Sequence, residues 1–478
     1  MKFFINKYRE LNLGVKSSLW FLICSICQKG ISFITIPIFT RLLSPDEYGL
    51  YSIYLSWENI ISIFATLNLS YQVFNNGMVK YSNKKDAYTS SMVGLTILSS
   101  FICLILMLVF NEKIFNFSGL NVYFIILMIS DILFVGIISL LTVRERYDFK
   151  YKLIATITIL SLFLNPVLGI LLVLTFKEKV IARVISVVIV NFIFSLISLI
   201  ILLKRDKNIV NKEYWKYALK IDLPLIPHYL AMILLSSSDR IMIGKICGNS
   251  YTAFYSIAYN AAMVMTILIN SVNSSFNPWI YKKLKDKDYD IIIKITNYLL
   301  IIIGIISILP MFFSPEIVKI LGDKEYYEAA YVMPIISSSV FITYLYSLFI
   351  SVELFFEKSK YVTYGTVAAT ILNIVLNIIF INKYGYIAAG YTTLLSYLLL
   401  SVFHYFSVKK IMKENNISRL FNLNLIVIIS IVVILIGLVI QLLYKRILIR
   451  YFIFMFLMLI ILINIKNVKK ILNILKNK

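Results

Sequence analysis

The chain has 478 residues, of which 60% are hydrophobic and 15% are charged, and its net charge is +23. Soluble globular domains are close to half apolar and a quarter charged, so this composition excludes that class. Apolar stretches of 18 or more residues recur along the sequence, and such stretches are typical of transmembrane helices. In a membrane protein an excess of basic residues is expected in cytoplasmic loops, which removes the argument for nucleic-acid binding.

The sequence predicts an all-α, multi-pass membrane protein with about fourteen transmembrane helices. The first apolar stretch ends in "FTRLLSPDEYG" without a small-residue cleavage site, so we expect a retained helix rather than a signal peptide. The connecting segments hold about 15 residues at most, which leaves no room for an extramembrane domain. The predicted spans are residues 16–40, 48–72, 87–110, 121–143, 152–176, 180–203, 217–243, 251–275, 291–313, 328–352, 361–381, 385–408, 421–443 and 447–465.

The distribution of lysine and arginine predicts the orientation of these spans, because basic loops remain in the cytoplasm. If the N-terminus is cytoplasmic, the cytoplasmic segments hold 33 of the 47 basic residues and the outer segments hold 13. Lys29 is then the one basic residue inside a span. We therefore expect both termini in the cytoplasm and the protein in a bacterial cytoplasmic (inner) membrane. Part of the excess charge should attract anionic lipids.

Two outer-loop segments resemble each other. "RLLSPDEYGLYSIY" (residues 41–54) and "KICGNSYTAFYSIA" (245–258) align without a gap at a constant offset of 204 residues. Six predicted spans separate the copies, so a duplication would give two halves of the same orientation, related by an axis along the membrane normal. The predicted organisation is a first lobe of spans 1–6 (residues 1–203), a second lobe of spans 7–12 (204–411) and a final helix pair with a basic tail (412–478).

Four motifs carry a resemblance to a known family. They are "RLLSPDEYGLYS" after the first span, "SSSDRIMIG" in the seventh and, more weakly, "FNPWIYKKL" after the eighth and "YGYIAAGYTTLLSY" into the twelfth. With the arrangement of six, six and two spans, the chain resembles the oligosaccharide flippases of bacterial polysaccharide synthesis. This family belongs to the multidrug/oligosaccharidyl-lipid/polysaccharide exporter superfamily.

The resemblance implies a function and a set of partners. The substrate would be an undecaprenyl-diphosphate-linked sugar repeat unit, moved from the inner to the outer leaflet by alternating access of a central cavity. The product would supply O-antigen, capsule or another surface glycan. The implied partners are this lipid-linked oligosaccharide and membrane lipids, together with a polysaccharide polymerase and glycosyltransferases.

Three charged residues of the first lobe are predicted near mid-depth, where an ionised group costs about 2.5–3.5 kcal/mol. Lys29 lies about 20 Å along the first span from Lys16, and Glu58 and Asp131 lie about 15 Å from the outer ends of spans two and four. The three residues either form an internal salt-linked set that holds the helices together or face a hydrated cavity. In the cavity, Lys29 would bind diphosphate, and the carboxylates would bind sugar hydroxyls or a coupling ion.

An acid and a base stand side by side in the seventh span, within "SSSDRIMIGK". Neighbours on a helix point about 100° apart, so Asp239 and Arg240 need separate partners. We expect Asp239 to pair with Arg41 or Lys245, and Arg240 to point into the cavity or to the outer surface. The alternative is an interfacial arginine beside an acid that ends the helix. The resemblance favours substrate-binding roles for Arg41, Asp239 and Arg240.

Two prolines, Pro224 and Pro227, interrupt the start of the seventh span in "KIDLPLIPHYL". Each removes a helical hydrogen bond, so the sequence predicts a kink that acts as a gate or serves packing alone. Asp222 is expected near the cytoplasmic surface, in contact with solvent. Of the two histidines, His228 is expected to be a polar packing residue and His404 to lie at the membrane interface.

Other functions remain open at this point. An ion-coupled small-molecule or multidrug exporter of the same superfamily usually has twelve spans, whereas a peptidoglycan-precursor flippase shares the count of fourteen. A membrane glycan polymerase or ligase would need a sizeable outer loop with catalytic residues; none is evident, so we expect no enzyme. Without a nucleotide-binding P-loop, energy would come from an H⁺ or Na⁺ gradient, the membrane potential or downstream glycan removal. The single CxxC pair in "CSIC" predicts no metal or redox cofactor.

Overall fold

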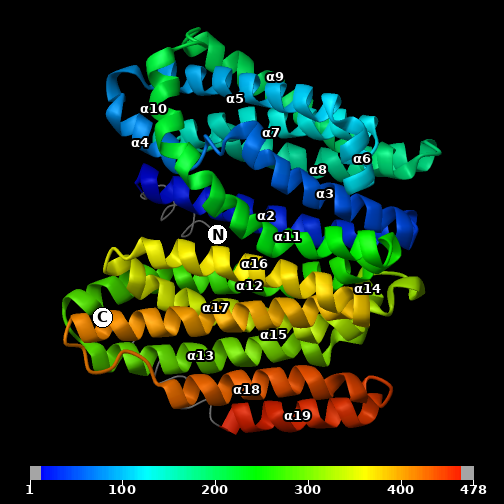
Figure 1. Ribbon diagram of the computed structural model, residues 1–478, viewed down its shortest axis with the longest axis vertical. Coiled ribbons are helices and arrows are strands. Elements are labelled where there is room, and N and C mark those ends of the chain that lie inside the picture. The colour runs from blue at the N-terminus through cyan, green and yellow to red at the C-terminus, as the bar shows by residue number, and fades with distance from the viewer. Residues whose placement is uncertain (1–11, 464–478) are drawn as a thin grey trace, which may run out of the picture.

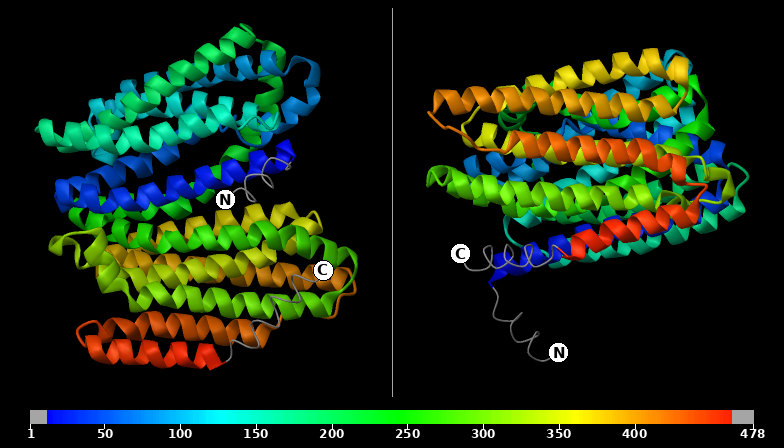
Figure 2. Two further views of the ribbon diagram at one scale, coloured as in Figure 1. Left: turned by 180° about the vertical axis from the view of Figure 1, so that it is seen from behind. Right: turned by 90° about the horizontal axis from the view of Figure 1, so that it is seen from below.

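The structure is a computed structural model that describes residues 12–463, apart from a few side chains that include Lys29. Every regular element in this range is helical (Figure 1), which confirms the predicted all-α class. The long helices run roughly parallel to one another and fill two halves of an elongated molecule (Figures 1 and 2). Short one-turn helices cap several of the connections.

The helices divide into three groups along the chain. The first group is α2 (Leu13–Leu42), α3 (Pro45–Thr66), α4 (Gln72–Lys80), α5 (Lys85–Val109), α6 (Asn111–Ser118), α7 (Val122–Tyr147), α8 (Lys152–Thr175) and α9 (Lys179–Arg205). The second group is α10 (Lys212–Asp222), α11 (Ile226–Ile246), α12 (Asn249–Lys285), α13 (Tyr289–Phe312), α14 (Ser314–Leu321), α15 (Ala329–Phe355), α16 (Ser359–Tyr384) and α17 (Ile387–Glu414). The third group is α18 (Leu423–Val439) and α19 (Ile447–Ile463).

Twelve helices in the described residues are long and apolar enough to cross a membrane, when α10 and α11 are taken as one. The predicted count of fourteen differs in two places. Span 48–72 corresponds to α3, which ends at Thr66, packs against α5, α7, α11 and α12, and is not among the twelve. Span 447–465 corresponds to α19, whose apolar part, Ile447–Phe456, is too short to be counted among the twelve.

We use N-lobe for α2–α9 and C-lobe for α11–α17; α18 and α19 lie on the far side of the C-lobe (Figure 1). The lobes meet where α3 packs against α11 and α12, with α2 also touching α12. α3 begins at Pro45 and α12 at Asn249, which are 249 − 45 = 204 residues apart, the offset of the sequence repeat. Equivalent helices of the two repeat copies therefore face each other across the lobe boundary.

The helix α10 belongs to the second half of the sequence but packs against α4 and α5 of the N-lobe. Its partners include a cluster of tyrosines, in which the rings of Tyr81 and Tyr214 lie 4.6 Å apart. The chain then turns at Leu223–Leu225 and enters the C-lobe as α11. The α10–α11 segment therefore connects the two lobes.

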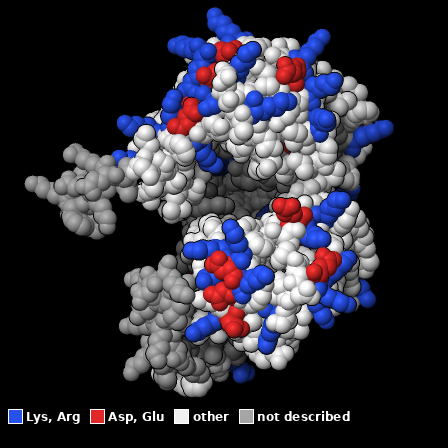
Figure 3. Space-filling model, turned by 90° about the vertical axis from the view of Figure 1, so that its left-hand side faces the viewer, with Lys and Arg blue, Asp and Glu red and all other residues white. Residues whose placement is uncertain are grey.

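Lysine and arginine side chains gather on the end of the molecule seen in Figure 3. We call this the basic end, and it includes the α4–α5, α7–α8, α9–α10 and α12–α13 junctions. The opposite end, here the distal end, includes the α2–α3 and α11–α12 junctions and α14. Between the lobes, the surface at the basic end is hollowed (Figure 3).

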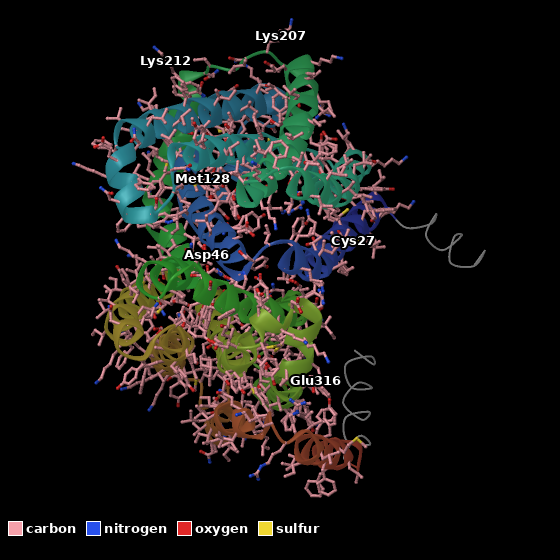
Figure 4. The ribbon with its side chains drawn as sticks, turned by 90° about the vertical axis from the view of Figure 1, so that its right-hand side faces the viewer. Cys27, Asp46, Met128, Lys207, Lys212 and Glu316 are labelled. Atoms are coloured by element: carbon pink, nitrogen blue, oxygen red, sulfur yellow. The ribbon has the colours of Figure 1, made fainter. Side chains whose placement is uncertain are left out.

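At the distal end the two lobes are joined by direct contacts. Asp46 lies at the boundary between them (Figure 4). A Cβ added to Gly49 would lie 1.8 Å from the carbonyl oxygen of Asn249, so α3 and α12 approach too closely there for any side chain at position 49. Hydrogen bonds that cross the boundary include those from Thr40 Oγ1 to Leu321 O (2.6 Å), from Tyr326 Oη to Leu43 O (3.0 Å) and from Asn249 Nδ2 to Asp46 Oδ2 (3.4 Å). The structure is therefore closed at its distal end.

Candidate functional site

A central cavity of about 310 Å³ lies between the lobes, lined by residues of α2, α3, α9 and α12. Its wall is partly aromatic and partly polar, with Tyr48 and Tyr51 from α3 and Asn260 from α12. α3 supplies two tyrosines because residues three apart lie on one side of a helix. The cavity lies on the basic-end side of the distal contacts, since Tyr51 and Leu55 in its wall follow Gly49 along α3.

The guanidinium of Arg183 faces this cavity from α9. Its Nη1 donates to Asn165 Oδ1 at 2.8 Å and to Ser186 Oγ at 3.0 Å, and the group stacks 4.1 Å from the ring of Phe39. Its Nε has no hydrogen-bond partner among the described residues. Arg183 is thus a buried cation that is 9% exposed. Hydrogen bonds hold its Nη1 in place, and its Nε can still donate a hydrogen bond.

Sequence reasoning missed Arg183, because it lies only three residues after the predicted start of its span at residue 180 and was counted with the charges of the preceding outer segment. Its position four residues after Lys179, the first residue of α9, was the available signal. An arginine one turn inside an apolar helix has to find partners within the protein. The count that left Lys29 as the one basic residue inside a span is corrected by this placement.

A second guanidinium, that of Arg240, comes from α11 in the C-lobe. It lies 4.2 Å from the ring centre of Tyr259, and its Nη1 donates to Ser236 O at 3.2 Å. Arg183 and Arg240 both interact electrostatically with the Tyr48 hydroxyl, to which the Asn260 side chain is also hydrogen-bonded. Two cations from opposite lobes therefore act electrostatically on one tyrosine in the wall of the central cavity.

The carboxylate of Asp239 turns away from these cations into the C-lobe. It accepts hydrogen bonds from Tyr255 Oη (2.6 Å), Thr393 Oγ1 (2.7 Å) and Asn377 Nδ2 (2.6 Å), and it is 1% exposed. The predicted pairing of Asp239 with Arg41 or Lys245 is therefore wrong. Neutral donors on α12, α16 and α17 replace the expected cation, because these helices pack around α11 more closely than the distal loops do.

The Asp239 cluster is rich in oxygen atoms. Asn373 donates to Thr393 Oγ1, Asn377 donates to Asn373 Oδ1, and Thr392 donates to Asn377 Oδ1. Carboxylate, amide and hydroxyl oxygens are the ligands that hard cations prefer. Asn373, Asn377, Thr392 and Thr393 were not predicted, since asparagine and threonine inside an apolar helix give no signal of which neighbour they face.

The N-lobe acids Glu58 of α3 and Asp131 of α7 lie together, as their common predicted depth suggested. Their carboxyl groups interact electrostatically, and Asn191 Nδ2 donates to Asp131 Oδ1 at 2.8 Å. Glu58 lines a cavity of about 360 Å³, and Asp131 is 4% exposed. The structure thus places the two acids near each other inside the N-lobe.

Two other predicted binding residues are placed differently. The side chain of Lys29, on α2, lies outside the described residues. Arg41 is exposed at the distal end, where its guanidinium donates to Pro37 O at 2.6 Å and approaches Ile320 O at 3.4 Å. Arg41 therefore contributes to the contacts between the lobes rather than to the cavity wall in this conformation.

The predicted kink lies where the two prolines are. A 3₁₀ turn, Leu223–Leu225, separates α10 from α11, with Pro224 inside the turn and Pro227 in the first turn of α11. Asp222 is not solvated as expected: it is 1% exposed, and neither carboxyl oxygen has a hydrogen-bond partner among the described residues. It is buried because α10 docks against the N-lobe immediately before the turn.

A buried acid–histidine pair was also missed. His404 is fully buried rather than interfacial, and its Nδ1 lies 2.9 Å from both oxygens of Glu353. The pair joins α15 to α17, and the ring of Tyr346 stacks on the imidazole. The described residues contain no group of three or more histidine, cysteine or acidic side chains that could hold a metal ion.

Comparisons with known proteins agree with this architecture. The model of the family described as "Polysaccharide biosynthesis protein" matches residues 15–284, and the MatE model matches residues 224–379. A protein of Haloferax volcanii named "Probable low-salt glycan biosynthesis flippase Agl15" is 22% identical over 397 residues, which are 81% of this chain and 82% of that protein. An uncharacterized membrane protein of Methanocaldococcus jannaschii, MJ1068, is 21% identical over 437 residues, 85% of this chain and 86% of that protein.

Solved structures show the same fold. A structure of the lipid II flippase MurJ in an inward closed conformation superposes with a TM-score of 0.68 at 16% identity, over 92% of this chain and all of that one. An inward-facing transporter of the MATE family superposes with a TM-score of 0.62 at 13% identity, over 82% of this chain and 96% of that one. These relatives are flippases and transporters, not enzymes. Because the family model matches more than half of the chain, the protein belongs to the polysaccharide biosynthesis protein family, within the superfamily of multidrug, oligosaccharidyl-lipid and polysaccharide transporters.

Proposed function

We propose that the protein flips an undecaprenyl-diphosphate-linked oligosaccharide repeat unit across the cytoplasmic membrane for surface polysaccharide synthesis. The observation that carries this proposal is that Arg183 of the N-lobe lines the central cavity and that Arg240 of the C-lobe, like Arg183, interacts electrostatically with Tyr48 in the cavity wall. A diphosphate carries negative charge that must be compensated away from water, and guanidinium groups match phosphate oxygens in geometry. Family membership and the Agl15 relative support a glycan-linked substrate.

Alternating access follows from the closure at one end. Cavities that continue toward the basic end would admit the head group, while the distal contacts between Thr40 and Leu321, Leu43 and Tyr326, and Asp46 and Asn249 keep the other side shut. Each such hydrogen bond contributes only about 0.5–1.5 kcal/mol, so rearranging them is reversible. A cation from each lobe would let one anionic head group draw the lobes together.

The proposal also includes the membrane in which the protein lies, its orientation there and its partner proteins. The basic end would face the cytoplasm, with both termini there, in a bacterial inner membrane. Membrane lipids would surround the long apolar helices, and a polymerase and glycosyltransferases of an O-antigen or capsule pathway would act before and after the flipping step. An H⁺ or Na⁺ gradient would supply energy, and the oxygen atoms around Asp239 are suited to hold Na⁺.

Reconstituted transport tests the proposal. The full-length protein in proteoliposomes should make an undecaprenyl-diphosphate-linked oligosaccharide accessible to a glycosidase on the far side. Lipid II and a cationic dye, in parallel vesicles, represent the peptidoglycan-precursor and multidrug alternatives. Transport of the dye without transport of either lipid-linked substrate would contradict a flippase role. Transport of lipid II alone would reassign the substrate while keeping the mechanism.

A further inference from the structure

The short helix α14 belongs to the C-lobe side of the distal closure. Its last two residues carry carbonyl groups that face the N-lobe. Thr40 Oγ1 of α2 donates to Leu321 O at 2.6 Å, and the guanidinium of Arg41 approaches Ile320 O at 3.4 Å. These acceptors are backbone atoms, so their position depends on where the whole of α14 is held.

The first turn of α14 is bound to α19. Arg450 Nη2 donates to Glu316 Oε1, and Tyr451 Oη donates to the same oxygen at 2.8 Å. Glu316 lies in the first turn of α14, where the partial positive charge of the helix N-terminus also favours an acid. This residue lies on the part of the C-lobe that is next to the C-terminal helices (Figure 4). An ion pair therefore joins α14 to α19.

Arg450 depends on this ion pair. Its side chain is fully buried, and its Nε and Nη1 have no hydrogen-bond partner among the described residues. The ring centres of Tyr444 and Tyr451 lie 5.6 and 5.2 Å from the guanidinium carbon, which adds cation–π attraction. Separation of α14 from α19 would leave a buried cation unpaired, which is strongly unfavourable. We therefore expect the ion pair to persist while the weaker hydrogen bonds to α2 break and reform.

The remaining contacts fix the geometry of this link. Tyr444, just before α19, donates from its Oη to Met311 O of α13 at 2.9 Å, so the start of α19 is attached to the C-lobe. Along α14, Glu316 and Ile320 are four residues apart, which is about one turn or 6 Å. Because one helical turn joins them, a shift of Glu316 also moves the carbonyl group of Ile320.

We propose that Arg450 is a positioning residue for transport, which holds α14 in place so that α2 closes against it at the distal end. The inference rests on the proposed flippase function and gives the C-terminal helix pair a part in it. Arg450 does not line the central cavity, so it acts through α14 and not on the substrate. Loss of Arg450 would let α14 shift, weaken its contacts with Thr40 and Arg41, and open the cavity to the distal side.

The test measures opening of the distal end separately from transport. The full-length protein carries Asn260→Cys in a cysteine-free background, and a membrane-impermeant maleimide is applied at the distal side. Arg450→Gln should raise the labelling rate, normalised to monodisperse protein, about tenfold or more, because hydrogen bonds to charged groups are the stronger ones. The matched control is Arg446→Gln, an exposed arginine four residues earlier, which should label like the wild type. In proteoliposomes, flipping of the lipid-linked oligosaccharide should fall in Arg450→Gln and not in the control.

Charge reversal separates the ion pair from a general loss of stability. Glu316→Arg combined with Arg450→Glu restores an ion pair and should lower the labelling rate toward that of the wild type, whereas each single reversal should label fast. If Arg450→Gln does not reach the membrane, the double variant Glu316→Gln with Arg450→Gln replaces it, because that variant leaves neither charge unpaired. Faster labelling of this neutral double variant would then support the positioning role.

The contrary outcomes are distinct. Wild-type labelling of Arg450→Gln, or of the neutral double variant, would overturn the proposal and leave the ion pair as an anchor for α19 alone. Fast labelling that charge reversal does not lower would also overturn it. If the wild type flips no substrate, the proposed function fails, while the labelling rates still test the position of α14.

Discussion

Gly49 of α3 lies directly against the backbone of Asn249, the first residue of α12. A Cβ at position 49 would stand 1.8 Å from the Asn249 carbonyl oxygen and 3.1 Å from its Cα, which no side chain tolerates. The contact joins the helix starts of the two repeat copies, so it sits on the boundary about which the lobes must move. Glycine is needed here for close backbone approach and not for a special backbone conformation.

Gly49→Val should therefore force the distal end apart. Opening would expose the central cavity, so a cysteine at Asn260 should react faster with a membrane-impermeant maleimide applied at the distal side. A cysteine-free background is needed, because the described chain contains four free cysteines. Gly30→Ala is the matched control, since an added Cβ there meets nothing within 4 Å. Equal labelling of the two variants, at equal abundance in the membrane, would show that this contact does not hold the end shut.

Substitution of Arg183, which lines the central cavity, or of Arg240, which interacts with Tyr48 in the cavity wall, should weaken binding of the head group. Arg183→Gln or Arg240→Gln should reduce flipping about tenfold or more, since a hydrogen bond to a charged group contributes about 1.5–3 kcal/mol. Pyrophosphate should protect wild type against thermal unfolding and protect the variants less. Lys113→Gln, a charge change at the distal surface, controls for net charge. Unaltered pyrophosphate protection in both variants would remove the cation pair from substrate binding.

Much of the architecture could be predicted because its cause lies in local sequence. Long apolar stretches specify helices whatever they pack against, and the positions of Pro224 and Pro227 located the turn between α10 and α11. The predicted span boundaries were wrong where polar residues end or continue a helix. The helix α3 ends at Thr66, before the predicted end at residue 72, and α12 continues to Lys285, where a loop was predicted after residue 275.

The site could be predicted only in part, because partners are set by packing between distant helices. Glu58 and Asp131 were recognised as buried charges, yet their proximity depends on how α3 rotates against α7. Asp239 was singled out correctly as a residue needing a partner. Its partners Asn377 and Thr393 lie 138 and 154 residues away, and no spacing rule connects them.

The predicted orientation in the membrane can be tested with reporter fusions that show whether a site lies in the cytoplasm or outside. Basic loops are retained in the cytoplasm, so the basic end should report cytoplasm and the distal end the outside. A split signal in which two or more sites are reversed would contradict the orientation. The cytoplasmic sites are Lys85, Lys207, Lys285 and Lys478, and the outer sites are Asp46, Lys113 and Asp323.

Substitution of the prolines at the Leu223–Leu225 turn should slow transport without lowering the amount of protein in the membrane. Replacing Pro224 and Pro227 with alanine restores two backbone donors and favours a continuous helix, which stiffens the link between α10 on the N-lobe and α11 on the C-lobe. Flipping should slow more than membrane abundance falls. Pro166→Ala, inside α8, is the control for proline loss in a helix. Unchanged flipping at normal abundance would assign the two prolines to packing.

Variants of Lys29 distinguish two roles for this residue, a cation in the cavity or a partner in a structural salt link. If it binds the diphosphate, Lys29→Arg should keep much of the activity because the charge is kept. Lys29→Ala and Lys29→Glu should abolish surface glycan while the protein remains in the membrane.

If Lys29 instead neutralises Glu58 or Asp131, removing it strands a buried carboxylate, which typically costs about 3–5 kcal/mol. Lys29→Ala combined with Glu58→Gln or Asp131→Asn should then recover both abundance and transport. Surface-glycan staining, normalised to membrane protein, measures both cases. Recovery by the double variants would refute substrate binding by Lys29. Failure of the double variants to recover, with Lys29→Arg active, would place Lys29 with Arg183 and Arg240 among the cations that receive the head group.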